Sequence, residues 1–315
     1  ILRGGGHGRA AARAQLCARL VHLARAHAAS PEEAPACAAA LSMLSALVNA
    51  ETPRGSGAPV LAALEASDAI ALCIELVAST TSAPPLLERA ATLACDLLER
   101  EWPTVGSGHA QAMRALLAPS SSARSLFAHA HARLAEACEI LRTEAADAPA
   151  ASVHAAVGLN ASAGGARSMY GSYTRTVVTA VRAATGGVVS WDDGGGFEDG
   201  GPEGVLRAAG ATLALLATLC RSPDPAQMQS LMHKQSATAG SYNLVIDAAS
   251  LLPPLVPLAA SGRATLVSAT LGALEAMVAG AHVDNQWLLV RRRIPHACSA
   301  LLTLPDRAPN AASGA

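Results

Sequence analysis

Apolar residues return every three or four positions along most of this chain, and almost no stretch alternates between apolar and polar residues. The first spacing places apolar side chains on one face of an α-helix, whereas alternation would place them on one face of a strand. The chain is therefore predicted to be all-α. In residues 121–145, the expected buried side of the helix consists of Leu126, Phe127, His131, Leu134, Cys138 and Leu141.

The core of such a protein has to be built from small and aliphatic side chains. Apolar residues make up 51% of the 315 positions, but aromatic residues make up only 3%. Alanine and leucine have the highest helix propensities, and the runs of Val, Ile, Thr and aromatic residues that form strands are nearly absent. A chain of this length can bury a large core in one or two domains.

The predicted helices fall into two blocks, residues 1–146 and residues 204–307. Residues 147–203 between them are rich in Gly, Ala and acidic residues, and they are predicted to form a flexible, disordered linker with a short helix at 174–185. Residues 308–315 are predicted to be a disordered tail. Helices are predicted at 9–29, 30–48, 66–80, 84–101, 108–117, 121–145, 203–221, 224–236, 241–252, 263–280 and 284–303.

Successive long helices with one apolar stripe, joined by short loops, are typical of helical-repeat solenoids, because no single pair of helices can bury its own apolar face. The chain has no strict internal period, so any repeat in it is degenerate. We therefore predict an irregular armadillo-like helical solenoid in two blocks, in preference to a globular helical bundle.

Two polar pairs stand directly before buried runs and need a separate explanation. In "GSYNLVIDAASLL", Ser241 is predicted to cap the helix over 241–252, because its hydroxyl can accept a hydrogen bond from an unpaired first-turn amide. The pair Tyr242-Asn243 and the later pair Asn285-Gln286 are predicted to hold loops between helices by hydrogen bonds.

The charge pattern argues against nucleic acid as a partner. The net charge is −1, and Lys234 is the only lysine among 23 basic residues. Because the arginines are scattered among acidic residues at helical spacing, no basic face is expected for nucleic acid or for an anionic membrane.

The seven cysteines are far apart, and no CxxC pair occurs. An odd number of unclustered cysteines within apolar helices favours buried free thiols in a reducing cytosol over disulfides or a zinc site. The cysteines are Cys17, Cys37, Cys73, Cys95, Cys138, Cys220 and Cys298.

Three local clusters could carry chemistry, and a structural role is favoured for each. His129 and His131 point about 200° apart on a helix, so they cannot share a metal, and His131 with Cys138 would supply only two ligands. The triplet Arg291–Arg293 matches the solvent side of a helix better than a phosphate site or a subunit contact. Four acidic residues match a solvated tether better than a Ca²⁺ loop, because they lack its alternating spacing: Asp192, Asp193, Glu198 and Asp199.

The sequence contains no nucleophile-elbow, Walker, zinc-protease or paired-carboxylate motif. The chain is therefore predicted not to be an enzyme and to bind no cofactor or metal. Its most apolar run, residues 206–220, is shorter than the roughly 20 residues that a membrane span requires, so no transmembrane helix is predicted. The start at Ile1 without an apolar signal core is expected for a piece of a longer protein.

Residues 216–252 and 268–302 resemble the associated homology domain shared by inositol trisphosphate receptors and ryanodine receptors. The family carries a Tyr-Asn-Leu-Val helix, then a Thr-Leu-x-x-Leu helix and then an Asn-Gln pair. The matching residues here, called the signature residues below, are Tyr242, Asn243, Leu244, Val245, Thr270, Leu271, Leu274, Asn285 and Gln286. Residues 66–80, 86–101 and 125–142 are similar in order and spacing to helices that precede this domain in inositol trisphosphate receptors.

The resemblance implies a cytosolic regulatory segment of a ligand-gated intracellular calcium-release channel. Such a segment relays conformational change to a pore that lies outside this chain. The implied partners are other domains and subunits of the same homotetrameric channel, on the cytosolic face of the endoplasmic reticulum or a similar membrane, which the protein contacts only through segments outside this chain. The resemblance carries no ligand, cofactor or metal residue to this chain.

Two other hypotheses stay open at this stage. The chain could be a soluble armadillo-like scaffold that binds a peptide or protein along a concave face, with no channel attached. It could also be a calcium-binding module centred on the acidic residues of the linker.

Overall fold

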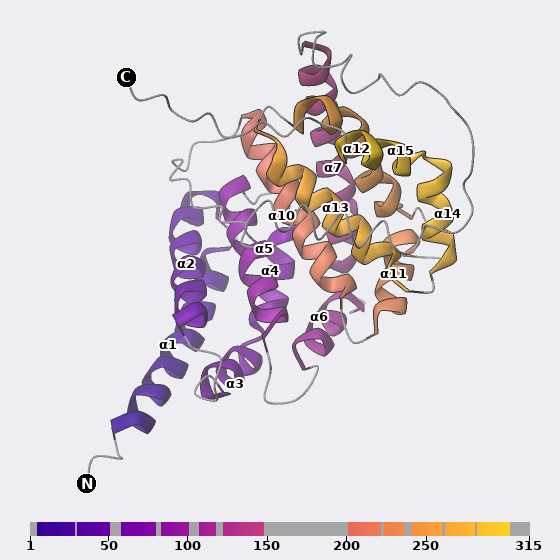
Figure 1. Ribbon diagram of the computed structural model, residues 1–315. Helices are drawn as coiled ribbons and strands as arrows, with labels where there is room; N and C mark the ends of the chain where they lie inside the picture. The colour runs from indigo at the N-terminus through magenta and orange to yellow at the C-terminus, as the bar shows by residue number, and fades with distance from the viewer. Residues whose placement is uncertain are drawn as a thin grey trace, which may run out of the picture.

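The fold is that of a computed structural model, shown in Figure 1. It describes residues 5–28, 30–50, 58–79, 83–100, 107–117, 122–147, 201–221, 224–235, 241–259, 262–280 and 282–302. Every regular element within these ranges is helical, which confirms the all-α prediction. Most of the predicted linker, including its short helix and its acidic residues, and the predicted tail lie outside the described residues.

The first part of the chain contains the helices α1 (Gly5–His27), α2 (Ala34–Ala50), α3 (Ala58–Ala66), α4 (Ala69–Val77), α5 (Pro84–Leu98), α6 (Ser107–Leu117) and α7 (Ser122–Asp147), with a 3₁₀ turn, η1, at Pro31–Glu33. The second part contains α10 (Pro202–Cys220), α11 (Pro225–His233), α12 (Leu244–Leu258), α13 (Ala264–Val278), α14 (Val283–Arg291) and α15 (Ile294–Leu302).

The main helices pack in two layers. One layer runs from α2 through α5 and α10 to α13, and these four helices lie next to one another in that order. The other layer runs from α1 and α4 through α7 to α12, and each of its helices packs against a helix of the first layer. The helices thus form successive pairs across the layers, namely α1 with α2, α4 with α5, α7 with α10, and α12 with α13.

One hydrophobic core joins the helices on both sides of the undescribed residues 148–200. The predicted boundary between the two blocks falls between α7 and α10, and these helices pack directly against each other. Among the described residues, α10 is the one helix long and apolar enough to cross a membrane, and 78% of its apolar window is buried inside the protein. It contacts α5, α7 and α13, so its apolar surface serves the core.

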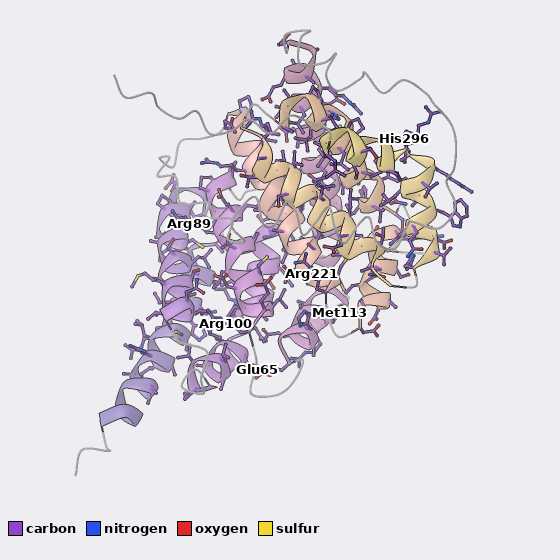
Figure 2. The ribbon with its side chains drawn as sticks, in the orientation of Figure 1. Glu65, Arg89, Arg100, Met113, Arg221 and His296 are labelled. Carbon is purple, nitrogen blue, oxygen red and sulfur yellow. The ribbon has the colours of Figure 1, made fainter. Side chains whose placement is uncertain are left out.

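Polar side chains line the contact between α2 and α5. Asp96 accepts hydrogen bonds from Ser45 Oγ (2.9 Å) and Asn49 Nδ2 (3.1 Å). Arg100 Nη2 donates to Asn49 Oδ1 at 2.7 Å, and Arg89 contacts Ser42. Figure 2 shows both arginines along this contact. The hydrogen bonds fix how far α2 and α5 are shifted relative to each other along their axes.

The structure corrects three predicted helix boundaries. The predicted helix 66–80 begins only at Ala69, because Asp68 has a left-handed backbone (φ 52°) that separates α4 from α3, a helix that was not predicted. Asp tolerates this conformation better than most residues. The predicted helix 284–303 is divided into α14 and α15 at Arg293 (φ 57°). The helix predicted to end at residue 252 instead continues to Leu258.

The core is built as expected from small and aliphatic side chains. In α7, the residues predicted to be buried are buried, except that His131 is only half-buried. All seven cysteines are free, five are buried and two are half-buried, so the prediction of buried free thiols is largely confirmed. Burial raises the pKa of Cys95 and of Cys220 to about 12, which leaves these thiols protonated at neutral pH.

Candidate coupling site around the start of α12

Helix α12 begins at Leu244, and Asn243 rather than the predicted Ser241 caps it. Asn243 Oδ1 accepts a hydrogen bond from the Ile246 amide at 3.1 Å. Ser241 lies two residues too early to reach the first turn, and its hydroxyl instead accepts from the Gln235 amide at 3.1 Å. The cap therefore comes from a signature residue, and the role of Asn243 is to set where α12 starts.

Gln235 binds the backbone of Tyr242 in both directions. Its Oε1 accepts from the Tyr242 amide at 2.8 Å, and its Nε2 donates to the Tyr242 carbonyl, also at 2.8 Å. Asn243 Nδ2 lies 3.2 Å from Nδ1 of His233, the last residue of α11. These bonds confirm the prediction that the pair Tyr242-Asn243 helps to hold the connection between two helices.

Three amide side chains bind the C-terminal carbonyls of α13, and we call them the amide cluster: Gln229 from α11 and Asn285 and Gln286 from α14. The last carbonyls of a helix have no backbone partner within it. Gln229 Nε2 donates to the carbonyls of Ala276 (2.8 Å) and Ala279 (2.6 Å). Asn285 Nδ2 donates to the Met277 carbonyl at 2.9 Å.

The amide cluster also joins three helices. Asn285 Nδ2 donates to the Gln229 carbonyl at 3.2 Å, and both side chains are almost completely buried. Gln286 is exposed and donates to the carbonyls of Val278 (3.1 Å) and Gly280 (2.8 Å). The prediction that the pair Asn285-Gln286 holds an interhelical loop is confirmed. Gln229 was not predicted, because a glutamine inside a helix gives no local signal of a partner 47 residues away.

The start of α12 is also attached to α7. His131 Nδ1 lies 2.8 Å from Asp247 Oδ2, and the His131 ring stacks on the Tyr242 ring with centroids 4.9 Å apart. Burial raises the pKa of the Asp247 carboxyl, and the hydrogen bond with His131 opposes that rise. His131 was predicted as a core position of its helix, but its ring lies at the edge of the core, where it contacts a signature residue.

A second contact of α7 is made by Arg263, which joins the helix ends on either side of the undescribed residues 148–200. Its Nη2 and Nε bind both carboxylate oxygens of Glu144 at 2.7 and 3.2 Å, and its Nη1 binds Glu203 at 2.6 Å. Glu144 lies in the last turn of α7, Glu203 in the first turn of α10, and Arg263 precedes α13. A bidentate arginine between two carboxylates fixes the relative position of these three helix ends.

The apolar signature residues belong to the core and carry no chemistry. Leu244 and Val245 are fully buried in α12, and Leu271 and Leu274 are buried in α13. The fully buried Thr270 bonds its hydroxyl to the Leu266 carbonyl of its own helix at 2.7 Å.

The other candidate residues are not brought together as a site. His129 and Cys138 lie on α7, and Cys138 donates to the Ser250 carbonyl of α12 at 3.3 Å. Arg291, Arg292 and Arg293 are exposed at the break between α14 and α15. Among the described residues, no group of three or more His, Cys, Asp and Glu side chains is placed to hold a metal ion.

No protein-family model, curated protein or solved structure matches this chain. Its function therefore has to be argued from the residues and their geometry. The signature residues are joined to α11 and to the end of α13 by hydrogen bonds, and to α7 by the contact between the Tyr242 and His131 rings. A displacement of one of these helices therefore strains contacts with the others. This arrangement is suited to mechanical coupling between helices.

Proposed function

We propose that this chain is a cytosolic regulatory segment of a ligand-gated intracellular calcium-release channel of the inositol trisphosphate receptor type. In this proposal it relays a conformational change to a pore formed outside this chain. The observation that carries the proposal is the amide cluster, in which the Asn-Gln pair of the signature binds the end of the helix that contains Thr270, Leu271 and Leu274. The motifs that carry the resemblance are thus parts of one structural unit.

The packing of the helices supports the finer prediction of an irregular armadillo-like solenoid. Successive pairs across two layers, from α1 with α2 to α12 with α13, are what such a stack requires. A stack of close-packed helices moves as semi-rigid bodies, since its interfaces change between discrete arrangements rather than deforming continuously. We infer that the relay uses rigid displacement of these pairs, with α7 acting on α12 through the His131–Asp247 contact.

The proposal places the chain in a homotetramer on the cytosolic face of the endoplasmic reticulum or a similar membrane. The open reading frame that encodes this chain tests it. We expect about six apolar segments of about 20 residues each downstream of residue 315. An open reading frame without any such segment would refute the channel.

A functional test follows if those segments are present. In vesicles that contain the full-length protein, Asn285→Ala is expected to reduce inositol trisphosphate-evoked Ca²⁺ release without abolishing ligand binding, because the change lies in the relay. Gln15→Ala, which changes an exposed glutamine on α1 outside the amide cluster, is the matched control and is expected to release Ca²⁺ like the wild type. Equal release by all three proteins would contradict a relay through the amide cluster.

The alternative function, an armadillo-like interaction scaffold without a channel, is favoured by one observation. Leu16 and Leu23 lie seven residues apart on one face of α1 and are 41% and 45% exposed. Exposed apolar side chains on one face of a helix form a surface to which a protein partner can bind. The absence of membrane spans from the full reading frame would decide for this function.

A further inference from the structure

Helix α14 carries an apolar stripe on the side that faces away from the core. Val283, Trp287 and Val290 are 55%, 58% and 43% exposed, and their spacing of four and three residues places them on one face of the helix. On the other side of the helix, Asn285 is fully buried in the amide cluster. In Figure 1, α14 lies at the outer edge of the molecule, and His296 of the following helix is labelled on the same side in Figure 2.

Two exposed residues of opposite charge lie along one side of this stripe. Asp284 and Arg291 are seven residues apart, so they lie on the same flank, one near each end of α14. Among the described residues, neither side chain forms an ion pair within the chain. The stripe therefore has an acidic end and a basic end, with Trp287 near its centre.

We propose that α14 binds α14 of a second copy of this chain in an antiparallel arrangement, about a two-fold axis near Trp287. A two-fold interface uses the same surface on both copies, so the surface has to be complementary to itself. Antiparallel pairing places Val283 beside the partner's Val290 and Trp287 beside the partner's Trp287. It also places Asp284 beside the partner's Arg291, and the symmetry produces this ion pair twice.

The charges select this arrangement over the other ways of covering the stripe. Parallel pairing about a two-fold axis would place the two copies of Asp284 on opposite flanks at one end of the interface and the two copies of Arg291 on opposite flanks at the other end, so neither side chain would gain a partner of opposite charge. A uniformly acidic partner would meet Arg291 favourably but Asp284 unfavourably. A second copy in antiparallel orientation satisfies both ends of the stripe.

The contact is expected to be weak. A two-turn helix face buries less than the roughly 1,000 Å² of total surface that a stable interface needs, so the free chain should dimerise only at high concentration. In an assembly whose geometry lets two copies of α14 meet, their effective concentration would be about millimolar, where such a contact would form. The inference does not rest on the proposed function, because a chain without a channel would pair in the same way.

Sedimentation equilibrium of the 315-residue chain over a range of concentrations tests the proposal. The wild type is expected to pass from monomer to dimer. Asp284→Arg alone and Arg291→Asp alone each replace two attractive contacts by two repulsive ones, and each is expected to weaken dimerisation about tenfold. Arg114→Asp, which changes an exposed arginine on α6, is the matched control and should dimerise like the wild type.

The two charge variants also provide a test that a structural side effect cannot imitate. When Asp284→Arg is mixed with Arg291→Asp, each copy meets the opposite charge on the other, so the mixture is expected to dimerise as strongly as the wild type. The double variant Asp284→Arg/Arg291→Asp should also regain dimerisation, and Trp287→Ala should lose it.

Three results would overturn the proposal. One is a wild type that stays monomeric at every concentration. Another is dimerisation that is unaffected by Trp287→Ala or is not restored in the mixture of charge variants. The third is binding of α14 to an acidic peptide or to anionic vesicles by a chain that does not self-associate.

Discussion

Asn285→Ala is expected to lower the free energy of unfolding by about 2–4 kcal/mol. The substitution removes the donor from two carbonyl oxygens, those of Met277 and Gln229. The Met277 carbonyl lies in the last turn of α13, where no backbone amide of that helix can replace the donor. A buried polar group without a partner costs about 1–3 kcal/mol. The Gln229 carbonyl lies within α11 and should add less, and the small cavity left by the side chain should add the remainder.

The matched control for this change is Gln286→Ala. It removes the same kind of bonds, to the carbonyls of Val278 and Gly280, but at an exposed position where water can take over as donor. The control is therefore expected to cost at most about 1 kcal/mol.

Urea unfolding followed by circular dichroism would measure both variants, and hydrogen exchange would show whether the loss is centred on α13 and α14. If Asn285→Ala and Gln286→Ala cost the same within about 0.5 kcal/mol, burial of the amide cluster would not contribute to stability and the reasoning would be wrong.

Three further predictions concern other parts of the fold. Burial raises the pKa of Asp247 above its ordinary 3.8, so the native state binds this proton more tightly. Protonated Asp247 therefore contributes to the free energy of unfolding, fully below about pH 3.8, and this contribution is lost as the pH rises through the raised pKa. Asp247→Asn should remove this contribution from the pH dependence of urea unfolding. Pro253 lies inside α12, and its nitrogen cannot donate a hydrogen bond to the preceding turn. Pro253→Ala is therefore expected to raise the free energy of unfolding by about 1–2 kcal/mol. An unchanged free energy of unfolding would mean that α12 ends before Pro253. The buried Cys73 and Cys220, whose thiol pKa values are raised by burial, should react with a thiol reagent at neutral pH only after unfolding, and rapid labelling of these two residues in the folded protein would contradict their burial.

The periodicity of apolar residues predicted the fold class and most helices, because the core faces of helices such as α7 and α10 follow it directly. It could not predict where long helices are interrupted. Asp68 and Arg293 adopt left-handed backbones within apolar patterns that continue on both sides. No Gly or Pro stands at the first break, whereas Pro295, the second residue of α15, was a signal for the second break that the periodicity alone does not use. The continuation of α12 through Pro253, Pro254 and Pro257 is the opposite case, in which tertiary packing outweighs a local signal to stop.

The candidate site was predictable only in part. The two polar pairs Tyr242-Asn243 and Asn285-Gln286 were noticed because they interrupt apolar patterns, and hydrogen bonds with helix ends explain them. Gln229 and Gln235, which contribute as many of these bonds, belong to an ordinary polar helix face in sequence. Only the folded arrangement distinguishes them from solvated glutamines.

The same device recurs at other helix ends and explains why local sequence is a poor guide to them. Arg25 of α1 donates to the carbonyls of Ser67 and Asp68 just after α3, and Arg133 of α7 donates to the Val77 carbonyl at the end of α4. These donors are 42 to 56 residues away from the carbonyls that they bind. Because a helix end of this kind is completed by a neighbouring helix, successive pairs of helices are joined by side-chain hydrogen bonds to backbone carbonyls as well as by apolar packing. Displacing one helix then removes the hydrogen-bond donors from carbonyls of another helix. The free energy lost with these bonds is what would make the pairs move together.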